Sequence, residues 1–220
     1  MSVALMYKDE LKGFYKSKVM LFLWTGLPFL ALLIHIWNPK TEKEMPLALF
    51  SSLLVSSISG TIASVMLTVG IIHEKSKGIY PLFLIRPIKR WNILIGKFFA
   101  VYTCIAIAGA ITIAIGFIVD QVSMGGISGE LVKATLKSFV MTLSMMAIAS
   151  SAGILIGVLA PSVLVGVILV LYGGNQVSAL GILPSMLKVS HQEIFTLGAG
   201  VILSALLLFL AVFIFNRKQF

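Results

Sequence analysis

The sequence predicts an all-α polytopic membrane protein, and three observations support this fold class. Of the 220 residues, 59% are hydrophobic and only 11% are charged, whereas a soluble domain has about 25% charged residues. The apolar residues are gathered in long runs, and the basic residues concentrate in alternate connecting segments, as in multi-pass membrane proteins. This composition excludes a soluble enzyme, a nucleic-acid-binding domain and a disordered tail.

Six apolar runs predict six membrane-spanning helices, because a helix needs about 20 apolar residues to cross a bilayer. The longest run, 134–174, would form a helix about 60 Å long. We divide it at Pro161, which lacks a backbone N–H and marks a turn. The predicted spans are 19–37, 47–72, 93–119, 134–159, 161–174 and 197–215, within one domain over 19–215.

The distribution of charge predicts the orientation of these spans. The N-terminal segment, the loop between the second and third spans and the tail 216–220 lie on one side, with twelve Lys or Arg residues and three Asp or Glu residues. The opposite side carries five of each kind. Because cytoplasmic segments are enriched in Lys and Arg, we expect a protein of the cell membrane with both termini in the cytoplasm.

The N-terminal segment, residues 1–18, has the pattern of an amphipathic helix. Apolar residues recur at helical spacing, whereas lysines occupy the other side: the two sets are Ala4, Tyr7, Leu11 and Phe14, and Lys8, Lys12 and Lys16. We expect this helix to lie at the inner membrane interface and to contact anionic lipids. The alternative is a solvated basic segment.

The loop 73–91 is long and basic, yet it contains an apolar core. Ile79, Leu82, Phe83 and Ile85 would form one side of a short helix that Gly78 opens and Pro87 ends. Such a helix must be covered by lipid or by another protein, so the pattern predicts a docking element. Glu74 precedes it at the end of a span, where an unpaired carboxylate is costly. We expect Lys77 or Arg90 to pair with Glu74; the alternative is that these are all headgroup-level charges.

The segment from Glu74 to Lys97 resembles the corresponding segment of ABC-2 type permeases, the membrane subunits of type 2 ABC exporters. The matching positions are Glu74, Gly78, Leu82, Pro87, Arg90, Ile95, Gly96 and Lys97, whereas Ile79 and Pro81 depart from the family pattern. The outer segment 175–195 resembles the re-entrant outer helices of these permeases.

The resemblance implies that the loop is a coupling helix seated in a groove of a separate cytoplasmic ATPase subunit. It further implies that nucleotide-driven closure is transmitted through Glu74, Gly78, Tyr80, Leu82, Phe83, Leu84, Arg86, Pro87 and Arg90. A second permease copy or a related permease would complete the membrane domain, and export is the direction that the resemblance implies.

The chain lacks motifs for chemistry of its own. It has no G-x-x-x-x-G-K-[ST] motif, which cradles nucleotide phosphates. We therefore expect no enzyme activity and no cofactor on this chain, with ATP and Mg²⁺ on the partner ATPase. His73-Glu74 opens like a zinc-binding H-E-x-x-H motif, but Lys77 stands where the second histidine is needed. The single cysteine, Cys104, permits no internal disulfide.

Small residues recur every four positions in the second span, at Ser52, Ser56, Gly60 and Ser64. Such a stripe permits close helix packing, and the alternative is that it lines a translocation route at a dimer interface.

The leading hypothesis for the function of the whole chain is a permease subunit of an ABC transporter. The alternatives are a non-transport scaffold or sensor that binds a cytoplasmic partner, and a secondary transporter or channel. The spans hold no mid-bilayer ionisable residue, which disfavours a secondary transporter.

Overall fold

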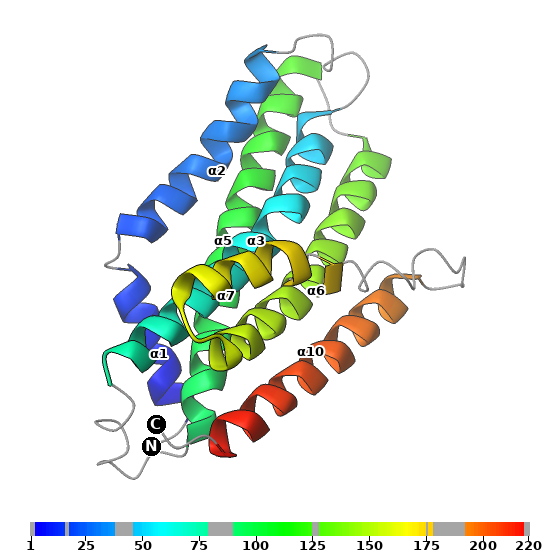
Figure 1. Cartoon of the computed structure of the whole chain (residues 1–220). Helices are drawn as coiled ribbons and strands as arrows, with labels where there is room; N and C mark the ends of the chain where they lie inside the picture. Colours follow the sequence, from blue (N-terminus) through cyan, green and yellow to red (C-terminus); the bar gives the residue numbers. More distant parts are fainter. Residues whose placement is uncertain are drawn as a thin grey trace.

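The computed structural model describes residues 3–15, 18–37, 46–78, 90–124, 128–174, 176–177 and 192–217. Of these residues, 96% are helical and none lies in a strand, which confirms the all-α class. The helices are α1 (Val3–Tyr15), α2 (Lys18–Trp37), α3 (Leu47–Ser76), α5 (Arg90–Met124), α6 (Gly129–Leu159), α7 (Val163–Leu169), the π-helical η2 (Val170–Gly174) and α10 (Gln192–Arg217). They form an elongated bundle, and the first turn of α1 and the last turn of α10 lie at the same end of it (Figure 1).

Four helices are long and apolar enough to cross a membrane: α3, α5, α6 and α10. The pair α1 and α2, bent by 64°, passes the same test when it is taken as one span, which raises the number to five. Six spans are therefore not confirmed within the described residues. The predicted fifth span, 161–174, corresponds to the short apolar stretch Val163–Gly174. At 1.5 Å per residue this stretch is about 18 Å long, which is less than the thickness of the bilayer core.

The predicted break at Pro161 is confirmed, because α6 ends at Leu159 and α7 begins at Val163. Ser162 starts the new helix, and its side-chain oxygen accepts a hydrogen bond from the backbone N–H of Val165. The predicted short helix within 79–89 and most of the outer segment 175–195 lie outside the described residues.

The bundle is organised around α3, which packs against both α5 and α6. Small residues let α3 and α6 approach closely, because a Cβ atom on Gly153 would lie 2.6 Å from the Cα of Ser64. The Thr68 hydroxyl donates a 2.7 Å hydrogen bond to the carbonyl of Gly153. Apolar side chains fill the space between α3, α5 and α6, among them the fully buried Leu94, Ile105 and Ile154.

A buried carboxylate joins the last turns of α5 to the start of α3. Asp120 is 2% exposed, and its two oxygens accept hydrogen bonds from the backbone N–H groups of Leu47 (2.7 Å) and Ala48 (2.8 Å). These N–H groups have no partner within their own helix, and the negative charge is favourable at a helix N-terminus. Asp120 thus acts as the cap that Pro46, the residue before α3, does not provide.

Candidate functional site at the loop end of the bundle

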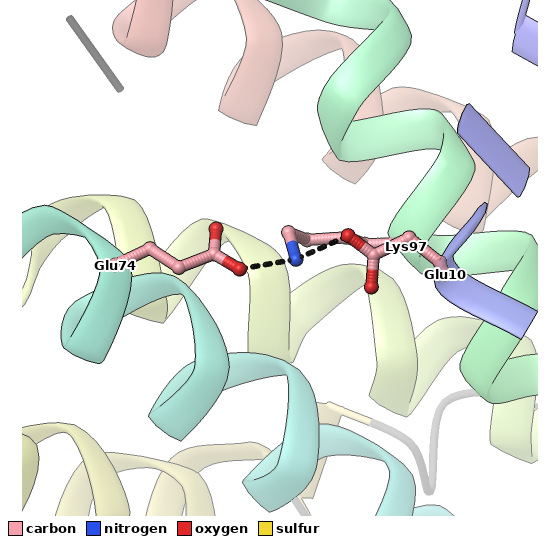
Figure 2. Close-up of polar contacts among 3 residues, drawn as sticks. All are labelled: Glu10, Glu74 and Lys97. Atoms are coloured by element: carbon pink, nitrogen blue, oxygen red, sulfur yellow. Dashed lines mark hydrogen bonds and ion pairs between the residues drawn. The ribbon is translucent and has the colours of Figure 1, made fainter. Parts of the chain in front are cut away.

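Three charged side chains from three helices meet where α3 ends. Lys97 of α5 lies between Glu10 of α1 and Glu74 of α3, as Figure 2 shows. The Lys97 Nζ donates to Glu10 Oε1 at 2.7 Å and to Glu74 Oε1 at 2.6 Å. The lysine side chain is only 8% exposed, compared with 22% and 20% for the two glutamates. One ammonium group therefore connects the N-terminal helix to both helices that flank the loop.

The close approach of α1 to α5 makes this cluster possible. A Cβ atom on Gly96 would lie 3.0 Å from the Cβ of Met6 and 3.3 Å from the backbone nitrogen of Tyr7, so a larger residue would push the helices apart. Glu10 follows the buried Met6 by four residues, and residues four apart share a face of a helix. Met6, which touches Gly96, and Glu10 therefore lie on the same face of α1, and Glu10 reaches Lys97 from this face.

The cluster holds two carboxylates and one ammonium group in a region that is largely removed from water. The second oxygen of Glu74, Oε2, is buried and has no hydrogen-bond partner among the described residues. Loss of one partner from a buried ion pair leaves an uncompensated charge, which costs far more than loss of a surface pair. The two glutamates are therefore held near each other only as long as Lys97 is present.

The partner of Glu74 differs from the expected one. Lys77, one of the two expected partners, is exposed at the end of α3, and the observed partner is Lys97. The side chain of Arg90, the other expected partner, lies outside the described part of the chain. Lys97 can reach Glu74 because α5 begins at Arg90. Lys97 therefore lies two turns inside α5, beside the end of α3. The sequence did contain a signal for the pairing of Glu74 with Lys97, because Gly96 and Lys97 belong to the same motif as Glu74.

Gly78 ends α3 in a conformation that favours glycine. Its φ angle is +62°, in the left-handed region that other residues enter at a cost. The backbone N–H of Lys77 donates to the carbonyl of His73, and that of Gly78 donates to the carbonyl of Lys75. The remaining predicted coupling residues, Tyr80, Leu82, Phe83, Leu84, Arg86 and Pro87, lie outside the described residues.

The small-residue stripe of α3 lies largely inside the chain. Ser52, Gly60 and Ser64 are buried, and Ser56 is partly buried, with its hydroxyl 3.9 Å from the sulfur of Met145. A Cβ atom on Gly60 would lie 3.3 Å from the Cβ of Ala149 in α6. These contacts support the packing interpretation, and the translocation route stays a prediction.

Among the described residues, no group of three His, Cys, Asp or Glu side chains is placed to hold a metal ion.

These features define an all-α membrane protein, with at least four helices suited to cross a bilayer and a charged cluster at the end of the bundle. The profile of the family described as "Protein of unknown function (DUF2705)" matches residues 13–188, and the chain belongs to this family. A search of curated proteins gave no match. The matched region includes Glu74 and Lys97, whereas Glu10 precedes it.

Proposed function

We propose that this protein is the membrane-spanning subunit of an ABC transporter of the ABC-2 type. In this proposal it exports its substrate, and a separate cytoplasmic ATPase subunit that docks on the loop 74–90 supplies the energy. The observation that carries the proposal is the ion pair between Glu74 and Lys97, which joins the two helices that flank the loop. The sequence motif that suggests a docking loop thus has its two ends linked by a direct contact.

The cluster is suited to transmit a movement of the loop to several helices together. A displacement of the loop would act on the end of α3 and the start of α5, which the Glu74–Lys97 pair holds in register. Through Glu10 it would also act on α1. Coupling between sites is carried by packed side chains and ion-pair networks of this kind. An isolated surface ion pair would contribute little, but here the lysine is buried.

The finer topology is part of the same proposal: six spans, with both termini in the cytoplasm. It is supported by the excess of basic residues on the side of the termini and by the positions of α1 and α10, whose outer ends lie at one end of the bundle (Figure 1). In this topology the short apolar stretch Val163–Gly174 would be the fifth span. A second copy or a related permease would form the other half of the membrane domain, with ATP and Mg²⁺ bound by the ATPase subunits.

The proposal is tested by purifying the full chain from its native membranes through an affinity tag, followed by mass spectrometry. We expect a P-loop ATPase in stoichiometric amount. In the variant with Leu82→Asp and Phe83→Asp, charges replace the apolar face of the docking helix. We therefore expect the ATPase no longer to co-purify with the chain, and the chain no longer to stimulate ATP hydrolysis by the ATPase.

The matched control carries Gln121→Asp and Val122→Asp, two exposed residues at the opposite end of α5. This variant should retain the ATPase. If the loop variant keeps both the ATPase and its stimulated activity, the docking surface is assigned wrongly. If the purified chain alone transports without ATP, the ABC transporter proposal itself fails.

A further inference from the structure

An apolar groove of about 420 Å³ lies where α1, α2 and α5 meet. The axes of α1 and α2 are bent by 64° relative to each other, and α5 packs against both helices. The groove is walled by apolar side chains and has two lysines at its edge; the lining residues used below are Leu11, Met20, Trp24 and Ile107, with Lys8 and Lys12 at the edge.

The wall of the groove is built from side chains that are held in place. The indole Nε1 of Trp24 donates a 3.3 Å hydrogen bond to the carbonyl of Cys104, which fixes the ring against α5. The ring of Tyr15 meets the ring of Trp24 edge-on, with 6.4 Å between centroids. Met20 is 2% exposed and closes the floor. A preformed apolar recess of this size lies within the range of small-molecule binding sites.

The edge of the groove is positively charged. Lys8 and Lys12 are four residues apart and therefore lie on the same face of α1, and both are exposed. Neither forms an ion pair with a carboxylate of the described residues, in contrast to Lys97, which has two. These two ammonium groups are thus free to bind an anion at the mouth of an apolar recess.

We propose that this groove binds one anionic phospholipid, with an acyl chain against the apolar wall and the headgroup phosphate between Lys8 and Lys12. Ile107 lines the groove and is half exposed on α5, a helix suited to span the membrane, so a lipid could enter from the bilayer at this residue. Tyrosine and tryptophan prefer the headgroup boundary of a membrane. Tyr15 and Trp24, which both line the groove, are consistent with a groove that lies at this boundary. Lysines near the membrane surface attract anionic lipids.

This site is more specific than the general contact that an amphipathic basic helix makes with headgroups. It has one occupant, a defined acyl-chain recess and two named lysines, and it does not depend on the proposed transport function. A zwitterionic lipid fits the recess equally well but has no net negative charge for the lysines. The site should therefore discriminate lipids by headgroup.

Native mass spectrometry of the full chain in mild detergent tests the proposal, with phosphatidylglycerol and phosphatidylcholine as the probes. We expect one phosphatidylglycerol to be retained in preference to phosphatidylcholine. Substitution of Lys8→Gln together with Lys12→Gln should weaken phosphatidylglycerol retention about 25-fold, since each lysine near a membrane surface contributes about fivefold. The Ile107→Trp variant, which fills the recess without changing charge, should reduce retention of both lipids.

The matched control carries Lys77→Gln and Lys133→Gln, which remove two exposed lysines that do not line the groove, and it should bind phosphatidylglycerol as the unaltered chain does. Unchanged elution on size exclusion shows that each variant is folded. Equal retention of the two lipids by the unaltered chain overturns the proposal. So does an equal loss in the control and in the Lys8 and Lys12 variant, which would indicate general surface charge.

Discussion

Lys97 and Glu74 lie 23 positions apart in the sequence, yet their side chains meet at 2.6 Å. The contact closes the base of the loop that the two residues flank. It also recruits Glu10 from the N-terminal helix, at 2.7 Å from the same ammonium group. The junction of α1, α3 and α5 therefore depends on one buried lysine.

Replacement of Lys97 by Met should destabilise the protein by about 3 kcal/mol, because two carboxylates would remain close together without a counter-charge. Thermal unfolding in detergent measures the effect. The triple variant with Lys97→Met, Glu10→Gln and Glu74→Gln should recover most of the loss, since it removes the charges together. Lys133→Met, at an exposed position, is the control and should change little. An equal loss in the single and triple variants would show that packing, and not charge, decides the result.

Replacement of Asp120 by Ala should loosen the start of α3. The backbone N–H groups of Leu47 and Ala48 would lose their shared acceptor, and the expected cost is about 2 kcal/mol. Hydrogen exchange measured by mass spectrometry should rise in the first turn of α3 and stay unchanged at its end. Glu130→Ala removes an exposed carboxylate from the first turn of α6 and should not alter exchange in α3. Unaltered exchange at Leu47 in the Asp120 variant would contradict the capping role.

Substitution of Gly153 by Ala should separate α3 from α6, because the new Cβ atom would meet the backbone of Ser64 at 2.6 Å. Overpacking of this kind costs about 1–3 kcal/mol. Gly198→Ala is the matched control, since a Cβ atom there meets nothing within 4 Å. That change should be neutral or stabilising by up to about 1 kcal/mol, as alanine favours a helix over glycine. The two melting temperatures in the same detergent provide the comparison, and equal values would refute the packing account.

Gly78→Ala should destabilise the end of α3 by about 1–2 kcal/mol, because its φ of +62° places a Cβ atom in the left-handed region. Gly78→Asn should cost less, since asparagine enters this region more readily. The difference between the two variants in thermal unfolding tests the conformation. If both variants melt at the same temperature as the unaltered chain, the backbone at this position is not constrained.

Several elements of the fold could be predicted because they depend on local properties of the chain. The apolar runs predicted the long helices, and Pro161 predicted the break between α6 and α7 correctly, since proline acts through its own missing N–H. The number of spans was harder to predict. The length of an apolar run does not show whether a helix of the required length forms, and the run 161–174 corresponds to the shorter apolar helix Val163–Gly174, so that six spans are not confirmed.

The candidate site was predicted only in part. Glu74 was identified from its place at the end of an apolar run, but its partner was not. Lys97 lies in the helix after the loop and Glu10 in the helix before α2, so their meeting depends on how three helices pack. No periodicity within a single segment encodes such a contact. Gly96 allows α1 to pack closely against α5, and this contact brings Glu10 to Lys97. The role of this glycine can be recognised only when the packing of the helices is known.

The sequence by itself determined the class of this protein, its long apolar helices and the uneven distribution of charge, because hydrophobicity and helix-breaking residues act locally. Only the tertiary structure decided which groups become partners. It placed Lys97 between Glu10 and Glu74, set Asp120 on the start of α3 and formed the groove edged by Lys8 and Lys12. Each of these depends on the distance between helices, which small residues such as Gly96 and Gly153 set by allowing backbones to approach.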